Sequence, residues 1–277
     1  MQKAEDFIVE TPLKNVYHIQ DRAESCTTLI VGSQKALLVD TGTGCGDLKR
    51  LIKSLTNKSL IVVNTHSHLD HCGGNFQFDQ VFLNEREFRV GHLYMEERNI
   101  RPAVLEQFEK MGHHMPEERQ KQYLNYHLEN ADTLKMDEEI DLGGIHVMPV
   151  PMYSHSPGMT GFYVKERKLL LGGDSVCIMA CLYFQEASSI ETHIRMLQEV
   201  SKLDFHYILT SHSRELLNRD DFEAMQECAK NYEPSKTFRY ADRFYPQFGG
   251  RMFLYESVKG KIAIVVAKKE EKYTCKK

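Results

Sequence analysis

Four potential metal ligands lie within six residues of this chain, shortly after an apolar run. The run is Leu60 to Asn64, and the ligands belong to the segment His66-Ser67-His68-Leu69-Asp70-His71. Such a run is typical of a buried strand, and a loop at a strand end can turn all four side chains toward one point. Imidazoles with a carboxylate suit zinc first, and also iron or manganese, because this ligand set is borderline rather than soft. The chain is therefore expected to carry a metal site on a loop that leaves a buried strand.

Strand and helix patterns alternate on both sides of this motif. The runs Lys35 to Asp40 and Lys168 to Asp174 each lead a strand into a turn that carries an aspartate. This similarity suggests an α/β fold made of two related β/α halves that face each other. Strands are predicted at residues 15–20, 27–31, 35–39, 60–64, 140–142, 145–150, 161–164, 169–171, 207–210 and 261–267, and helices at 47–55, 190–203 and 220–231.

Residues 85 to about 130 have a different composition, rich in Glu, Arg, Gln, Met and His. Pro102 and Pro116 are well placed for the first turns of new helices. We therefore predict a helical insertion within a single domain that spans residues 1–277. It is expected to be either a solvated helical surface or a lid that shapes substrate access. The residues concerned are the histidines His92, His113, His114 and His127, and for the lid also the aromatic residues Phe238, Tyr240, Phe244, Tyr245 and Phe248.

Charge and composition exclude several classes of partner. The formal net charge is -4 and the basic residues are scattered, so no nucleic acid is expected as a partner. The longest late apolar run, Ile262 to Ala267, is too short to span a bilayer, so no membrane partner is expected. Seven cysteines without a CxxC pair are expected to be free thiols in a reducing compartment. The chain is predicted to be cytoplasmic and to act on a small molecule, and its oligomeric state has no signature in the sequence.

The histidine motif and its companions resemble the metallo-β-lactamase superfamily. Residues 66–71 match the family signature HxHxDH at every ligand position, and further matches follow in the same order along most of the chain. They are Val39-Asp40-Thr41-Gly42, Ser154-His155-Ser156-Pro157-Gly158, Gly172-Gly173-Asp174-Ser175 and Thr210-Ser211-His212. The resemblance implies a four-layer αβ/βα sandwich, in which two mixed β-sheets lie face to face between flanking helices. The metals would lie at one edge of the sheets.

The same resemblance implies a role for each matched residue. Two divalent cations, most readily zinc, that share one water lower its pKa from 15.7 to about 7, so a bridging hydroxide is available at neutral pH. Asp70 would both ligate and carry the proton from that water to the leaving atom. One metal would be held by His66, His68 and His155, the second by Asp70, His71 and His212, with Asp174 bridging both and Asp40 orienting a ligand histidine.

Differences between this sequence and individual branches of the family narrow the range of substrates to be expected. Asp174 stands where true β-lactamases usually carry Cys or Ser, and His68 stands where flavodiiron enzymes usually carry Glu. Cys177 stands where acyl-homoserine lactonases often have Tyr, and the chain has no obvious C-terminal helical domain for glutathione. We therefore predict a glyoxalase-II-like hydrolase of an ester, thioester or lactone of a small metabolite. The alternatives are a small-molecule phosphodiesterase and an iron-dependent dioxygenase, and the complete ligand set argues against a non-catalytic binding protein.

Two features near the motifs have simpler interpretations. Cys72, Cys177 and Cys181 lie close in sequence to predicted ligands, but we expect them to pack rather than to ligate. The loop Gly42 to Gly46 lacks the Gly-Lys-Ser/Thr ending of a phosphate-binding loop, so we expect a plain turn there.

Overall fold

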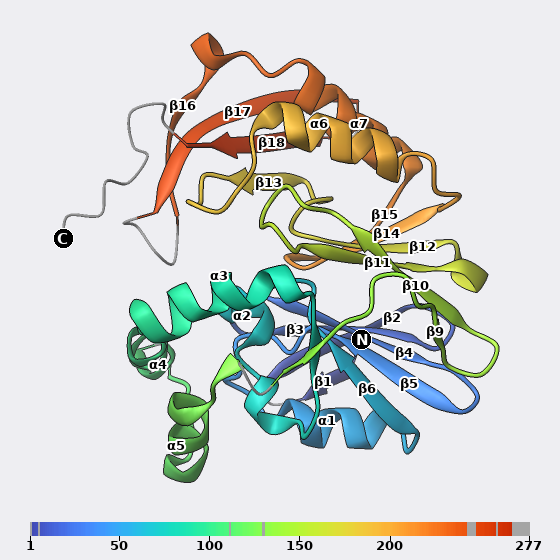
Figure 1. Cartoon of the computed structure of the whole chain (residues 1–277), viewed down its shortest axis with the longest axis vertical. Helices are drawn as coiled ribbons and strands as arrows, with labels where there is room; N and C mark the ends of the chain where they lie inside the picture. Colours follow the sequence, from blue (N-terminus) through green and yellow to red (C-terminus); the bar gives the residue numbers. More distant parts are fainter. Residues whose placement is uncertain are drawn as a thin grey trace.

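The computed structural model describes residues 2–4, 6–110, 112–128, 131–242, 248–258 and 260–267. Two mixed β-sheets lie one above the other, with helices on their outer sides (Figure 1). This is the layered arrangement that the sequence predicts. None of the described helices is long and apolar enough to cross a membrane.

The first sheet has eight strands in sequence order. Its strands pair antiparallel as far as β5 and parallel from β5 to β8. The parallel pair β5 and β6 needs a crossover, which helix α1 (Leu48–Leu55) supplies, and Asp47 caps that helix by accepting a hydrogen bond from Arg50 N. The strands are β1 (Gln2–Ala4), β2 (Phe7–Leu13), β3 (Val16–Asp21), β4 (Cys26–Val31), β5 (Lys35–Val39), β6 (Ser59–Val63), β7 (Phe82–Leu83) and β8 (Asp132–Thr133).

The second sheet has six strands, and in it only β12 and β14 run parallel to each other as neighbours. Helix α6 (Ile190–Val200) forms the crossover between these two strands, and helix α7 (Arg219–Lys230) follows β15. In order across the sheet the strands are β15 (Ser213–Asn218), β14 (Tyr207–Thr210), β12 (Leu169–Gly173), β11 (Thr160–Val164), β10 (His146–Pro151) and β9 (Ile140–Asp141).

A third sheet of four strands, in the order β13-β18-β17-β16, lies beside α7 (Figure 1). The sequence predicts β18 (Gly260–Val266) but none of its partners, β13 (Met179–Leu182), β16 (Phe238–Ala241) and β17 (Gly249–Ser257). The reason lies in tertiary pairing: β13 aligns parallel to β18, more than 70 residues away, and no local pattern reports such a contact.

Successive side chains of a strand point to opposite faces of its sheet and therefore enter different hydrophobic cores. On β5, Leu37 and Val39 enter the core between the two large sheets, whereas Ala36 and Leu38 point outward against α1. A further core joins the second sheet to α6, α7 and the third sheet. Each large sheet is therefore covered on both faces, which fixes its register and holds its strand ends in place.

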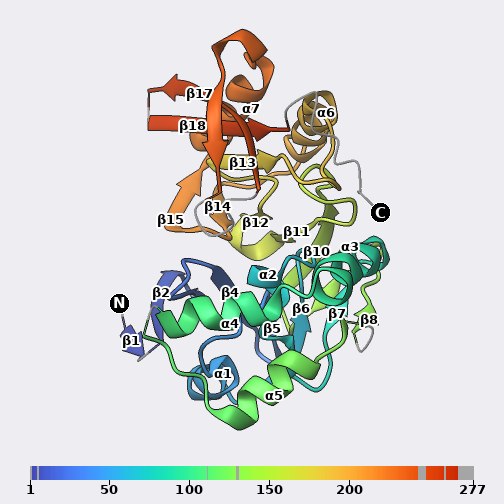
Figure 2. The ribbon, with the colours of Figure 1, turned by 90° about the vertical axis from the view of Figure 1, so that its left-hand side faces the viewer.

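The helical insertion packs on the short helix α2 (Leu69–Cys72), which carries part of the histidine motif. Pro102 is the second residue of α4, and Pro116 directly precedes α5. Both helices lie on one side of the first sheet (Figure 2). In order, the insertion contains a 3-10 turn (Glu85–Glu87), α3 (Phe88–His92), a π-helical turn (Leu93–Glu97), α4 (Arg101–Lys110) and α5 (Glu117–Asn125).

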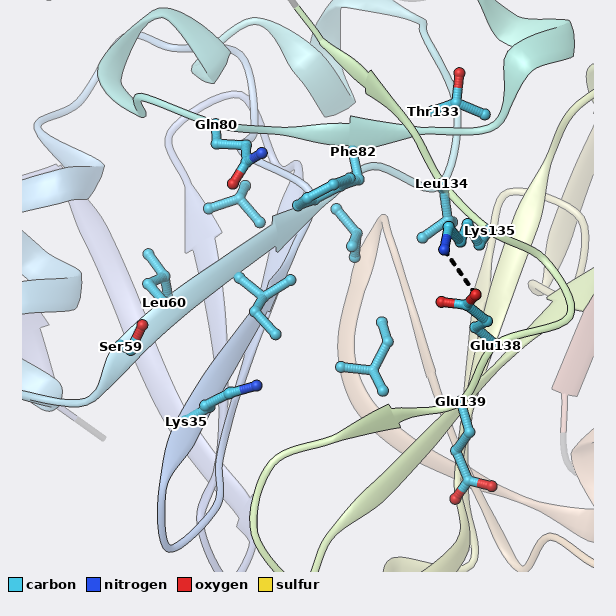
Figure 3. A pocket seen from close by; sticks show the side chains of 14 residues that line it. Lys35, Ser59, Leu60, Gln80, Phe82, Thr133, Leu134, Lys135, Glu138 and Glu139 are labelled. Carbon is cyan, nitrogen blue, oxygen red and sulfur yellow. Dashed lines mark hydrogen bonds and ion pairs between the residues drawn. The ribbon is translucent and has the colours of Figure 1, made fainter.

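A cavity of about 430 Å³ opens along β6 and β7, with Lys35 at one end (Figure 3). Its far wall includes the Lys135–Glu138 ion pair, with 2.7 Å between nitrogen and oxygen, and the start of β9. None of the predicted metal ligands lines this cavity. The histidine motif lies beyond the other end of β6, so the cavity is separate from the candidate site.

Candidate metal centre

The predicted ligands all lie in segments that follow strands at one common edge, and Asp70 and His71 stand in the short helix α2. Asp40 follows β5 and His66 follows β6, two parallel neighbours. In the second sheet, Asp174 follows β12 and His212 follows β14, which are also parallel. His155 follows β10, which runs in the same direction as β12 because both are antiparallel to β11. Since the carboxyl ends of parallel strands meet at the same edge, residues far apart in sequence come together there.

The seven side chains form three overlapping groups, and in each group the possible ligand atoms lie within 4.8 Å of one another. Two of these groups have the same members as the two predicted ligand sets, and the third links them through Asp174. The groups are His66, His68 and His155; Asp70, His71 and His212; and His66, His71 and Asp174.

In several histidines of the cluster, the ring nitrogen that points away from the cluster makes a hydrogen bond to the surrounding protein. His71 Nδ1 donates to Asp40 Oδ2 over 3.1 Å, and His155 Nδ1 donates to the Cys181 carbonyl over 2.8 Å. Asp40 itself has a left-handed φ of 64° and also accepts from Thr65 N at 2.7 Å. These outward bonds direct the other ring nitrogen of each histidine toward the cluster, which is how proteins orient metal ligands.

Three polar atoms inside the cluster are buried and make no hydrogen bond. They are His66 Nε2, His71 Nε2 and Asp174 Oδ1. Buried polar atoms are normally paired, because leaving one unpaired costs free energy. Two imidazole nitrogens and a carboxylate oxygen that converge without a hydrogen bond are a donor set for a borderline divalent cation. The residues present therefore fit the metal pair that the fold family implies.

The protonation of His66, His155 and Asp174 agrees with this fit. Burial and the neighbouring imidazoles hold the pKa of His66 well below its usual range, and burial lowers the pKa of His155 to about 4. Burial would raise the pKa of Asp174, but His212 and His71 outweigh it and hold that pKa well below its usual range. Neutral imidazoles and an ionised carboxylate are the forms in which these side chains bind metals. Against the effect of burial, Asp70 and Asp174 raise the pKa of His71 well above its usual range and that of His212 to about 9, so a bound metal would displace protons from these two rings.

The two ligand sets differ in their access to solvent. The side chain of His155 is 1% exposed, whereas His212 is 42% and Asp70 is 35% exposed. Asp70 Oδ2 lies 3.4 Å from the Nε2 atoms of both His71 and His212. The centre is therefore open to solvent on the side of Asp70 and His212.

Sequence analysis does not predict two groups that support His68, the carboxylate of Glu186 and the phenol of Tyr94. His68 Nε2 donates to Glu186 Oε1 over 2.7 Å, and the Tyr94 hydroxyl donates to the same oxygen over 3.0 Å. Glu186 lies between β13 and α6, and Tyr94 lies in the π-helical turn of the insertion. Neither has a local sequence signal, because both stand in segments without a motif.

Aromatic rings flank the centre beside His68, and two of them, Phe184 and Phe248, are half-buried. The Phe184 ring lies 4.7 Å from that of His68 and 5.9 Å from that of Phe248. The Arg98 guanidinium stacks over Tyr94 and Phe248 at 4.8 and 5.6 Å. Two of the five aromatic residues predicted near the pocket, Phe244 and Tyr245, lie outside the described residues; Phe238 is 47% exposed, and Tyr240 contacts Tyr183.

The remaining candidate residues make contacts that support a structural role and not a role in metal binding. Cys72 donates to the Ser67 carbonyl and Cys177 to the Asp174 carbonyl, and no described cysteine joins the metal-binding groups. In the Gly42 to Gly46 loop, Thr43 N and Oγ1 both donate to Asp21, so the loop is a turn organised by a protein carboxylate. The four histidines of the insertion are likewise outside the described groups.

Comparison with known proteins agrees with the fold. The sequence model of the metallo-beta-lactamase superfamily matches residues 24–212. The chain therefore belongs to the metallo-β-lactamase superfamily. A metallo-beta-lactamase from Pontibacter korlensis has the same fold, with a TM-score of 0.58 and 16% identity over 82% of this chain and 100% of that chain. A family protein from Thermus thermophilus, TTHA1429, gives a TM-score of 0.56 and 19% identity over 81% and 79%.

Two curated relatives are hydrolases of thioesters. The human acyl-coenzyme A thioesterase MBLAC2 is 25% identical over 220 residues, which are 74% of this chain and 77% of that protein. The hydroxyacylglutathione hydrolase GloC of Haemophilus influenzae is 27% identical over 161 residues, which are 54% of this chain and 66% of that protein. The chain is thus a hydrolase of the metallo-β-lactamase fold whose distant relatives include thioester hydrolases.

Proposed function

We propose that this protein is a dinuclear metal-dependent hydrolase that cleaves a thioester of a small metabolite, with zinc as the preferred metal. The observation that carries the proposal is the convergence of His66 Nε2, His71 Nε2 and Asp174 Oδ1, all buried and without a hydrogen bond. Relatives that hydrolyse acyl-coenzyme A and hydroxyacylglutathione support a thioester among the ester, thioester and lactone substrates that the sequence allows.

Metal ions bound at this centre would supply a nucleophile at neutral pH by lowering the pKa of a shared water. His66, His68 and His155 would hold one ion and Asp70, His71 and His212 the other, with Asp174 between them. Asp40 and Glu186 keep the rings of His71 and His68 in place through their hydrogen bonds. Because these partners fix each ring before substrate arrives, little reorganisation is needed during the reaction.

Asp70 would move the proton in this reaction. Its carboxylate lies on the exposed side of the centre, 3.4 Å from His71 and from His212. From there Oδ2 can take a proton from the attacking water and pass it to the leaving sulfur. A thiol has a pKa of about 8.5, far below that of an alcohol, so the thiolate leaves with modest help from an acid.

Metal analysis together with a substrate panel tests the proposal. Purified protein should hold two divalent ions per chain, and a chelator should remove its activity until zinc, cobalt or manganese is restored. The panel contains acyl-coenzyme A and acylglutathione thioesters, a lactone, a β-lactam and a small phosphodiester, with thiol release as the readout for thioesters. Phosphodiester cleavage without thioester cleavage would refute the proposal. One iron per chain with oxygen uptake would also refute it, in favour of an oxygenase.

A further inference from the structure

Glu87, at the end of the 3-10 turn that opens the insertion, is a carboxylate with 0% exposure. Its Oε2 accepts from Ser67 N at 3.0 Å and lies 2.9 Å from the Ser67 hydroxyl. Its Oε1 accepts from the Ser156 hydroxyl and from Gly158 N, each at 2.7 Å. One buried carboxylate therefore accepts hydrogen bonds from two separate loops.

These two loops carry the first predicted ligand set. Ser67 stands between His66 and His68 in the loop that follows β6 of the first sheet. Ser156 follows His155 directly in the loop after β10 of the second sheet. Glu87 thus links two loops that belong to different sheets and carry predicted ligands. The serines that it contacts, Ser67 and Ser156, are the direct sequence neighbours of the three histidines.

The surroundings of Glu87 are built to accept its carboxylate. A Cβ atom at Gly158 would lie 2.8 Å from Glu87 Cγ and 3.0 Å from its Oε1, so glycine at this position leaves the room that the carboxylate needs. The bonds to backbone amides and hydroxyls satisfy both oxygens.

We propose that Glu87 is a positioning residue that fixes the spacing of His66, His68 and His155 and thereby tightens metal binding at this set. The inference rests on the metal centre of the proposed function. A buried carboxylate behind the ligand loops adds negative charge near the cation and holds the ring nitrogens at a constant separation, and both effects favour binding. The helical insertion is then part of the metal centre and not only a cover over it.

The test compares Glu87→Gln with Glu85→Gln. Glutamine keeps the length of the side chain, but its amide nitrogen faces donors where a carboxylate oxygen accepts. Glu85 lies on the same turn and is exposed, which makes it a matched control. Zinc affinity is measured by chelator competition at fixed pH, and the visible absorption of the cobalt-loaded protein reports the coordination geometry.

In Glu87→Gln we expect one of the two zinc-binding steps to weaken by roughly 10-fold or more. The cobalt spectrum should also change at saturating cobalt, whereas Glu85→Gln matches the wild type in both measurements. A residue that only stabilises the fold would leave the cobalt spectrum of the folded protein unchanged. An unaltered affinity and spectrum in folded Glu87→Gln would overturn the inference.

A second variant covers the case in which Glu87→Gln does not fold. Ser156→Ala removes one donor to Glu87 and keeps the carboxylate, and we expect a smaller loss of zinc affinity of the same kind. If Ser156→Ala also binds zinc and cobalt as the wild type does, Glu87 has no role in positioning. Wild-type protein that binds no metal would instead refute the proposed function, so the two failures are distinguishable.

Discussion

Nε2 of His68 donates a hydrogen bond to Oε1 of Glu186, and Nδ1 of the same ring faces His155 Nε2 at 3.0 Å. Glu186 therefore selects the tautomer of His68 whose Nδ1 lone pair points into the centre. Burial would lower the pKa of His68, but its hydrogen bond and charge interaction with Glu186 raise that pKa overall. A predicted ligand histidine and the carboxylate that orients it thus come from different halves of the fold.

The first prediction concerns this pair. Glu186→Gln should weaken zinc binding by roughly 10-fold or more, because an amide no longer fixes the ring orientation of His68. Tyr94→Phe removes only the hydroxyl that donates to Glu186, so its effect should be smaller and in the same direction. Chelator competition measures both. Equal zinc affinity in wild type and Glu186→Gln would show that the carboxylate does not orient the ligand.

The second prediction concerns Asp174, whose Oδ2 lies 3.2 Å from His212 Nε2 while Oδ1 makes no hydrogen bond. Asp174→Asn keeps the size and loses the charge that offsets the repulsion between two cations. The second metal should bind more weakly and turnover should fall roughly 100-fold or more. Circular dichroism and thermal melting in excess zinc check the fold. Asp79→Asn, at a 98% exposed side chain, is the control. Two tightly held metals with near-normal turnover in Asp174→Asn would disprove bridging.

The third prediction concerns the aromatic wall. Phe184 lies beside His68 and His155, with ring distances of 4.7 and 5.4 Å. Phe184→Ala should raise KM for an acyl thioester by roughly 10-fold through lost apolar contact, and kcat should change less. Tyr207→Ala, at an exposed ring at the start of β14, should leave KM unchanged. Steady-state kinetics at full metal occupancy decide the matter, and an unchanged KM in Phe184→Ala would remove this ring from the substrate site.

The fourth prediction concerns stability and pH. His18 is buried, its Nε2 donates to the Ser213 carbonyl, and its Nδ1 accepts from the Thr28 hydroxyl, each at 2.9 Å. Burial lowers the pKa of His18, against the opposing effects of the Ser213 carbonyl and Glu10. The unfolded chain therefore binds a proton below about pH 6.5 that the folded chain does not, and stability falls as the pH drops below that value.

Replacing His18 by glutamine tests this dependence. The free energy of unfolding, measured in urea at pH 7.5 and pH 5.5, should differ less in His18→Gln than in the wild type. One proton accounts for at most about 1.4 kcal/mol per pH unit. His206→Gln, at an exposed histidine, should keep the wild-type difference. If His18→Gln kept the full pH dependence, another group would be responsible for it.

Local patterns predicted the elements that carry the ligands. The apolar run that ends at Asn64 is β6, and the strands before Asp40 and Asp174 are β5 and β12. These strands are buried and short, so their hydrophobic runs and terminal turns are strong signals. The order of the motifs, read through the family resemblance, predicted which residues meet at the strand ends.

The supporting residues were not predictable in the same way. Glu87 is one of several acids in a polar helical stretch, and only the placement of that stretch between two loops reveals its role. Glu186 and Tyr94 meet across 92 residues of sequence. Contacts of this range depend on tertiary packing, which leaves no period in the sequence. The cytoplasmic location of the chain stays a prediction.

Four of the predicted ligands, His66, His68, Asp70 and His71, belong to the segment after β6 of the first sheet, which includes helix α2. The other three, His155, Asp174 and His212, come from loops of the second sheet. Neither half alone can present a complete donor set, so occupancy of the centre reports that both halves have folded and docked. Ions that bind only the docked state stabilise it by mass action, and the midpoint of thermal unfolding should rise with free zinc. A chain whose two halves have not docked would lack part of the donor set and would be inactive.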